Sequence, residues 1–425
     1  RVFALVGAGP ASLAAAETLR QEGFCGRVVM LTRGAHLPCD TAGLSKERLG
    51  EPADQLLLRP PAFYEEWGIE AVRRATVTRL DTQGRELQYH VEGGDVVTLG
   101  YDAVLVASGS SPRRLPVPGA ELAGVHTLRT PEDAAEIARA GRKGQKVIVV
   151  GGSFISMEVA ASLHMRGCEV SIVAKEAVPF EHTFGKKIGG MFARLLAKED
   201  VRWFGSAEVR LFRGSGAVNG VELEDGEVLA ADAVVMGVGT SPNTEFMEDA
   251  LLDESRAVTV DPLLSSQVAA GVFAAGDVCS YPSLVTGAAA RVGHWNHAVQ
   301  QGRVAAQNML GRFRPFETVP FFSSSMFRRS VKFVGYPSSK LERVIVEGDA
   351  STMEFIAYYC EGDEIRSVLT VNRDQVAAAC AELMRRGVMP STSELMYGSV
   401  NAEVILERLQ GLSRQGGATA GSGRA

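Results

Sequence analysis

The chain lacks the cysteine spacings that build disulfide frameworks and zinc sites. It contains six cysteines, and none forms a C-x-x-C motif or pairs with a histidine at metal-ligand spacing. We therefore expect no disulfide framework and no bound metal. A reducing compartment, cytoplasmic or mitochondrial, is the simplest expectation for such single cysteines.

A basic excess and a long apolar run are also missing. The formal net charge is −6 at pH 7, which argues against a general binder of nucleic acid or anionic membranes. No uncharged apolar run approaches the ~18 residues that a membrane span requires. With 46% hydrophobic and 22% charged residues over 425 positions, the composition favours two or three globular domains.

Glycine is abundant, and the glycines cluster at the ends of apolar strands. The first cluster follows a strand at 2–6 and precedes an apolar-periodic helix at 13–20, with another strand at 28–31. This order predicts a βαβ unit in which Gly7 permits a sharp turn and Gly9 lets backbone amides approach a pyrophosphate. Ser12 stands where a third glycine is usual. The predicted loop residues are Gly7, Gly9, Pro10 and Ser12.

A second βαβ unit repeats the first about 140 residues later. Its strand at 147–150 runs into a glycine turn, a helix at 157–166 and a strand at 170–173. We expect a second dinucleotide there. The predicted contacts of this loop are Gly151, Ser153, Phe154 and Ile155.

Each unit is followed by a buried strand that ends in a glycine turn and a proline, at 101–113 and at 232–243. A third such strand ends in Gly276 and Asp277, which places a carboxylate at the carboxyl edge of the sheet. That carboxylate can accept hydrogen bonds from a ribityl chain. The candidate ligand contacts in these turns are Ser108, Gly109, Arg113, Gly239, Gly276 and Asp277.

Beyond residue 312 short alternating stretches precede an amphipathic helix at 375–386, which predicts an α+β domain on an antiparallel sheet. The fold class is therefore α/β, with two nested Rossmann-like domains and a C-terminal α+β domain. The predicted boundaries are 1–114 with 243–312, 115–242, 313–411, and a disordered tail at 412–425.

The ordered motifs resemble those of the ferredoxin-reductase-like flavoproteins, and most of all their apoptosis-inducing-factor-like branch. They are L-P-x-D-x-x-x-L-S-K, A-S-G-S-x-P-R, G-x-S-F-x-x-M-E-V-A, G-V-G-x-x-P-N, F-A-A-G-D and H-W-x-x-A-x-x-x-G-R. The resemblance implies FAD in the first domain and NADH or NADPH in the second. It implies an NAD(P)H oxidoreductase that delivers electrons to an iron–sulfur protein, ferredoxin or Rieske-type, or to a small oxidant. A homodimer and a preceding Rieske-type domain also occur in this branch.

Carried over by motif, the resemblance places Lys46 beside the flavin's reactive edge and pairs it with Glu158. A cation there stabilises reduced, anionic flavin, and a carboxylate partner limits the cost of burying the cation. The backbone of His294 and Trp295 is expected to lie against the flavin. Without the resemblance, Lys46 is equally compatible with a surface lysine and Glu158 with a carboxylate at a helix N-terminus.

Several positions depart from the family pattern. Thr41 replaces the usual arginine, and Ser323 stands where a flavin-side tryptophan is expected. The first βαβ unit ends in Thr32-Arg33 rather than in a ribose-binding carboxylate. The second ends in Ala174-Lys175-Glu176, where Lys175 favours NADPH and Glu176 can substitute for the carboxylate, which slightly favours NADH.

Two other functions remain open. Cys39 lies about 30 residues after the first glycine loop, where single-cysteine peroxidases and disulfide reductases carry a redox thiol. Alternatively, NAD(P)H binding serves to switch conformation or dimer state, with signalling as the output.

Overall fold

The computed structural model describes residues 1–284, 287–336 and 343–420, with the backbone alone for 413–420. The chain forms two compact units. Unit 1 contains residues 1–116, 125–140 and 235–318, and unit 2 contains residues 117–124, 141–234 and 319–425. Within the described residues, no helix is both long and apolar enough to cross a membrane.

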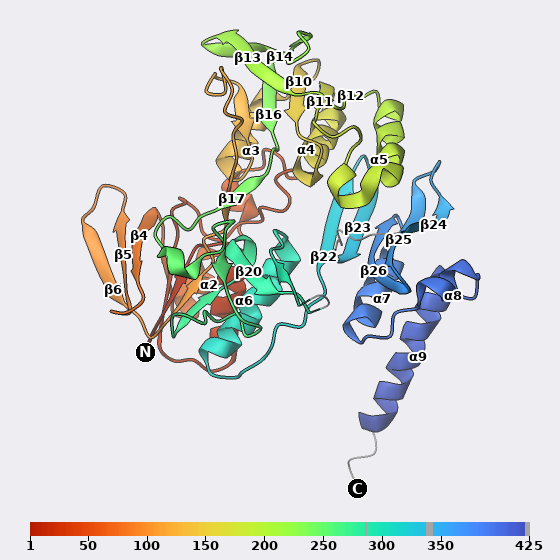
Figure 1. Cartoon of the computed structure of the whole chain (residues 1–425). Helices are drawn as coiled ribbons and strands as arrows, with labels where there is room; N and C mark the ends of the chain where they lie inside the picture. Colours follow the sequence, from red (N-terminus) through yellow and green to blue (C-terminus); the bar gives the residue numbers. More distant parts are fainter. Residues whose placement is uncertain (285–286, 337–342, 421–425) are drawn as a thin grey trace. The chain divides into compact units, whose positions relative to one another are not determined.

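A five-stranded parallel sheet with the order β19-β7-β1-β2-β3 forms the core of unit 1. Apart from the edge strand β3, these strands are short apolar runs in which almost every residue is buried, as expected for a parallel sheet covered by helices. Helices α1 (Pro10–Gln21) and α6 (Trp295–Met309) pack so closely that a Cβ on Gly302 would lie 2.1 Å from the Ala11 carbonyl oxygen. Helix α6, labelled in Figure 1, belongs to the same unit as the sheet. The strands are β1 (Val2–Val6), β2 (Arg27–Leu31), β3 (Ile69–Val72), β7 (Ala103–Val106) and β19 (Val272–Ala274).

The two strand-ending turns found in the sequence pair with each other. They form an antiparallel ribbon of β8 (Ser110–Pro112) and β17 (Thr240–Pro242). The remaining unit 1 elements are α2 (Pro61–Glu66), α3 (Pro131–Ala140), β4 (Ala75–Asp81), β5 (Glu86–Val91), β6 (Val96–Gly100), β9 (Val125–Thr127), β18 (Val258–Thr259), β20 (Cys279–Pro282), β21 (Ala289–Ala290) and the 3₁₀ turns 53–56, 249–251 and 276–278.

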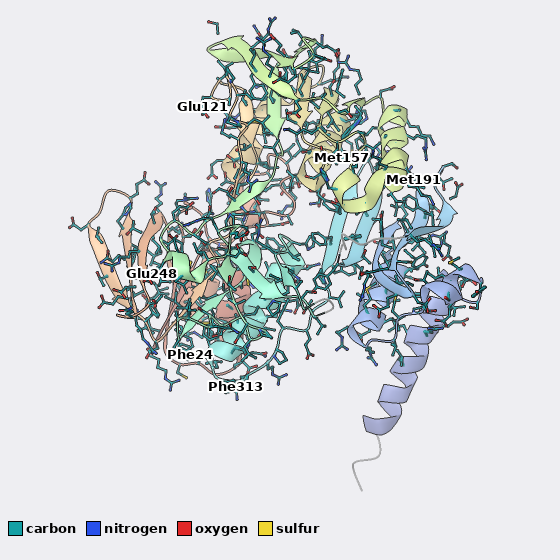
Figure 2. The ribbon with its side chains drawn as sticks, viewed as in Figure 1. Phe24, Glu121, Met157, Met191, Glu248 and Phe313 are labelled. Carbon is teal, nitrogen blue, oxygen red and sulfur yellow. The ribbon has the colours of Figure 1, made fainter. Side chains whose placement is uncertain are left out.

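Unit 2 repeats the βαβ arrangement and carries the C-terminal sheet. Met157 and Met191, labelled in Figure 2, belong to the buried residues of α4 and α5. Strands β12, β11, β10 and β16 are neighbours in that order, and β13, β14 and β15 form a small antiparallel sheet. These elements are α4 (Phe154–Met165), α5 (Glu181–Lys198), β10 (Lys146–Val150), β11 (Glu169–Val173), β12 (Arg202–Phe204), β13 (Val209–Ser215), β14 (Ala217–Leu223), β15 (Val228–Ala230) and β16 (Ala233–Met236).

The C-terminal sheet is antiparallel, with the order β22-β23-β26-β25-β24. The predicted fold class is therefore confirmed. Helix α9 continues to Ala420, into the segment 412–425 expected to be disordered, and 421–425 lie outside the described residues. The elements are β22 (Phe321–Met326), β23 (Arg329–Gly335), β24 (Arg343–Asp349), β25 (Glu354–Glu361), β26 (Glu364–Val371), α7 (Asp374–Arg385), α8 (Thr392–Met396) and α9 (Ala402–Ala420).

Candidate dinucleotide-binding sites

The first glycine loop (residues 7–12) has the geometry of a phosphate-binding turn. Gly7 adopts φ +113°, and a Cβ at this position would lie 2.1 Å from the Ala107 carbonyl oxygen. Gly9 is the N-cap of α1 and provides no side-chain cap, and a Cβ there would meet nothing within 4 Å. The first-turn amides of α1 can therefore serve an anionic ligand.

Ser12 fits the role of the missing third glycine. Its side chain is fully buried, and its hydroxyl has no hydrogen-bond partner among residues 1–284, 287–336 and 343–420. A small residue is required because the first turn of α1 packs closely on its surroundings. The loop thus fits the pyrophosphate of a dinucleotide.

Asp277 lies at the carboxyl edge of the unit 1 sheet, as predicted. Its carboxylate accepts a hydrogen bond from Ser110 Oγ at 2.9 Å and pairs with the Arg129 guanidinium at 3.1 Å. A Cβ on Gly109 would lie 2.8 Å from Arg129 Nη2. Gly109 therefore leaves room for Arg129. This arginine could not be predicted as part of the site, because a single Arg ahead of α3 belongs to no motif.

Ser108 and Arg113 hold the β8–β17 ribbon together. The Ser108 hydroxyl donates to the Asn243 carbonyl oxygen at 2.6 Å. The backbone amide of Arg113 donates to the Gly239 carbonyl oxygen at 2.9 Å, and its Nε donates to Ser241 Oγ at 3.1 Å. These hydrogen bonds are made to the protein itself, and the predicted contacts of Ser108 and Arg113 with a cofactor remain predictions.

Helix α6 is tied to Gly276 through Gln301, the seventh residue of the helix. The backbone amide of Gly276 donates to the side-chain oxygen of buried Gln301 at 2.7 Å. His294 is the N-cap of α6, where its Nδ1 accepts from the Asn296 amide at 3.3 Å, and Trp295 is the half-buried first residue of the helix. The two residues predicted to line the flavin thus begin the helix that packs against α1.

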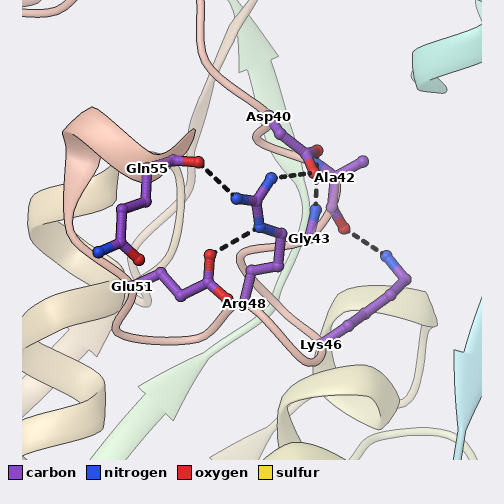
Figure 3. A network of polar contacts seen from close by, with 7 residues as sticks. All are labelled: Asp40, Ala42, Gly43, Lys46, Arg48, Glu51 and Gln55. Carbon is purple, nitrogen blue, oxygen red and sulfur yellow. Dashed lines mark hydrogen bonds and ion pairs between the residues drawn. The ribbon is translucent and has the colours of Figure 1, made fainter. Parts of the chain in front are cut away.

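A loop held by Arg48 carries Lys46 (Figure 3). The Lys46 ammonium donates to the Ala42 carbonyl oxygen at 2.6 Å. Arg48 pairs with Asp40 at 3.1 Å and with Glu51 at 2.8 Å. Position 41 carries threonine, and no motif of the sequence indicates that Arg48, seven positions further along the chain, holds the same loop.

Cys39 is buried in this loop and is a poor candidate for a redox thiol. Its Sγ donates to the Leu37 carbonyl oxygen at 2.9 Å. Burial, reinforced by the negative charges of Glu132 and Asp40, raises the pKa of the thiol to about 11. The reactive species is the thiolate, which at pH 7 is then roughly one part in ten thousand.

We therefore expect Cys39→Ser to leave peroxide-dependent NAD(P)H oxidation within about twofold of wild type, since the thiol is not ionised. The measurement is the rate of NADH consumption with and without hydrogen peroxide in both proteins. Loss of the peroxide-dependent part in the serine variant would restore the peroxidase interpretation.

The second glycine loop (residues 151–155) reproduces the first. Gly151 adopts φ +117°, and its amide donates to the Val173 carbonyl oxygen at 2.8 Å, as Gly7 does to Leu31. Ser153 is the N-cap of α4 and makes no side-chain cap. Phe154 is half-buried, whereas Ile155 is 43% exposed. This loop can present first-turn amides to a second dinucleotide.

Of the two charged residues after β11, Glu176 is the one beside this loop. A Cβ on Gly152 would lie 3.3 Å from Glu176 Oε2 and 3.0 Å from the Trp203 ring. Lys175 is exposed and pairs with Glu208 at 2.8 Å, and this hydrogen bond raises the pKa of Lys175. A carboxylate beside the loop is the arrangement that holds an unphosphorylated ribose.

Glu158 lies on α4 and is buried. Its carboxylate accepts a hydrogen bond from Ser324 Oγ of β22 at 2.5 Å. Ser323, which replaces the expected tryptophan, accepts from the Lys332 ammonium at 2.5 Å. The pairing of Glu158 with Lys46 stays a prediction.

The chain belongs to the pyridine nucleotide-disulphide oxidoreductase family, whose model matches residues 2–302. This membership and the relatives below confirm the resemblance, inferred from the motifs, to the ferredoxin reductases and apoptosis-inducing factors.

Among similar proteins, human apoptosis-inducing factor 3 is 38% identical over 90% of this chain, and the chain spans 63% of that relative's length. The probable ferredoxin reductase CtmF of Castellaniella defragrans is 32% identical, with 94% of this chain and 98% of the relative covered. A ferredoxin reductase from Rhodopseudomonas palustris has a TM-score of 0.87 at 26% identity, covering 92% of this chain and 96% of its own. The reductase of a covalent putidaredoxin reductase–putidaredoxin complex has a TM-score of 0.89 at 26% identity, covering 96% and 99%.

Proposed function

We propose that the protein carries electrons from NADH, through bound FAD, to an iron–sulfur protein. The observation that carries the proposal is the presence of two glycine loops of matching geometry in one chain, each at the start of a helix without a side-chain cap. Relatives named as ferredoxin–NAD(+) reductase components of dioxygenase systems, and the putidaredoxin complex, support the choice of acceptor.

The residues of unit 1 would hold the flavin. Gly7 and Gly9 shape the turn that receives the pyrophosphate, and Asp277, already oriented by Ser110 and Arg129, accepts from ribityl hydroxyls. FAD held by these residues would supply the change from the two-electron chemistry of nicotinamide to single-electron transfer. Lys46 supplies a fixed positive charge, oriented by its hydrogen bond to the Ala42 carbonyl.

The choice of NADH over NADPH follows from the charges beside the second loop. The Glu176 carboxylate lies near Gly152, where it can accept hydrogen bonds from ribose hydroxyls and repel a 2′-phosphate. Lys175, the residue that would favour the phosphate, is engaged by Glu208.

Replacing Glu176 with alanine should therefore narrow the preference for NADH over NADPH by roughly tenfold or more, since a like-charge repulsion and a ribose contact are both lost. The measurement is kcat/KM for each coenzyme with an artificial electron acceptor. Glu227→Ala removes an exposed carboxylate from the β14–β15 turn and is the matched control for net charge. An unchanged ratio in Glu176→Ala would refute the assignment.

A further inference from the structure

Strand β22 of the C-terminal sheet lies against helix α4 through two matched side-chain pairs. Phe154 and Phe322 stack with ring centroids 5.9 Å apart and planes 9° apart. Glu158 and Ser324 share the 2.5 Å hydrogen bond. Positions i and i+4 of a helix are about 6 Å apart along its axis, and positions i and i+2 of a strand are about 6.6 Å apart. One register therefore satisfies both pairs.

The hydrogen bond is made where water cannot replace it. Both Glu158 and Ser324 are 4% exposed. A buried carboxylate must be solvated by protein donors, and the Ser324 hydroxyl is one such donor. Ser325, the next residue on the strand, points to the opposite face and is exposed.

An aromatic cluster fixes the register of β22 on α4. Phe154 also contacts Phe180 and Phe184 with centroids 5.1 and 5.8 Å away. Phe184 in turn lies 5.3 Å from Phe333 of β23, the neighbour of Phe322 across the sheet. A slip of β22 by one residue would move Phe322 and Ser324 to the other face together.

We propose that Ser324 is a positioning residue, which holds the Glu158 carboxylate in the orientation that the electron transfer from NADH requires. This inference rests on the proposed function and on the position of Glu158, the fifth residue of α4, the helix that starts at the second glycine loop. The C-terminal sheet thereby contributes to the reaction of the coenzyme through the Glu158 carboxylate.

The test compares Ser324→Ala, Ser324→Thr, Glu158→Gln and the double variant Ser324→Ala/Glu158→Gln, with Ser325→Ala as the control on the exposed face. The rate of flavin reduction by NADH is measured anaerobically in the FAD-loaded full chain. The dissociation constant of NAD⁺ and the free energy of unfolding are measured on the same proteins.

We expect Ser324→Ala to slow flavin reduction by roughly tenfold or more, the effect of losing a hydrogen bond to a charged group. The rate of flavin reduction should stay within about threefold of wild type in Ser324→Thr, which keeps the hydroxyl, and in Ser325→Ala. The NAD⁺ dissociation constant of Ser324→Ala should also stay within about threefold of wild type. The double variant should resemble Glu158→Gln alone, both in the rate of flavin reduction and in the free energy of unfolding, because the two residues act as one unit.

Reduction of Ser324→Ala at the wild-type rate, or equal losses in the alanine and threonine variants, would overturn the positioning role and leave the proposed function standing. Additive effects of Ser324→Ala and Glu158→Gln would also overturn it. If NADH does not reduce the flavin of the wild-type protein, the proposed function is overturned, and this inference with it.

Discussion

Gly9→Ala is expected to give a folded protein that retains little FAD. Gly9 has φ −88° and ψ −174°, a conformation open to any residue. An added Cβ meets no protein atom within 4 Å, so the fold tolerates it. The methyl group would instead lie where the backbone approaches the pyrophosphate, and we expect FAD affinity to fall by at least about tenfold, or about 1.4 kcal/mol.

Gly7→Ala is the informative contrast. At φ +113° and with a Cβ 2.1 Å from the Ala107 carbonyl oxygen, this substitution strains the chain whether or not a cofactor is bound. Flavin-to-protein ratios and thermal unfolding of the apoproteins separate the two effects. Gly9→Ala protein with a full complement of FAD would show that the first glycine loop does not receive the pyrophosphate.

Lys46→Ala is expected to slow flavin reduction by NADH by about 100-fold, or about 3 kcal/mol, while NAD⁺ binding changes little. A preorganised charge beside the reacting group contributes amounts of this order. The hydrogen bond from Lys46 to Ala42 O and the ion pairs of Arg48 fix that charge before any ligand binds.

The control for this prediction is Lys46→Arg, which keeps a positive charge at the same position. It should recover part of the lost rate, because the positive charge is retained. The recovery should be incomplete, because the guanidinium of arginine presents its donors in a different geometry from the ammonium of lysine. The measurement is anaerobic stopped-flow reduction over a range of NADH concentrations. A wild-type rate in Lys46→Ala would remove Lys46 from the reaction.

The glycine loops could be predicted because their requirements are local. A turn that needs positive φ selects glycine, and the helix that follows it shows a periodic apolar pattern. The turns at Gly7 and Gly151 can therefore be recognised from the residues next to them in the sequence. Four strands of the C-terminal sheet could be predicted from alternating stretches of sequence, whereas β22 was not predicted, because its sequence FFSSSM does not alternate.

The polar contacts that complete the sites could not be predicted, because they join distant parts of the chain. Arg129 reaches Asp277 across 148 positions, and Ser324 reaches Glu158 across 166. Neither Arg129 nor Ser324 lies in a pattern that distinguishes it from other arginines and serines. Arg48 joins Asp40, Glu51 and the Gln55 carbonyl oxygen, yet it stands outside the motifs that the sequence offers.

The most direct test of the central claim is an anaerobic titration of the FAD-loaded protein with NADH and then with NADPH, followed by its visible spectrum. We predict that a small excess of NADH over protein bleaches the flavin band, and that a larger excess of NADPH is needed for the same bleaching. A protein that binds no FAD, or whose flavin band NADH leaves unchanged, would contradict the proposed function and leave a binding or signalling function for this fold.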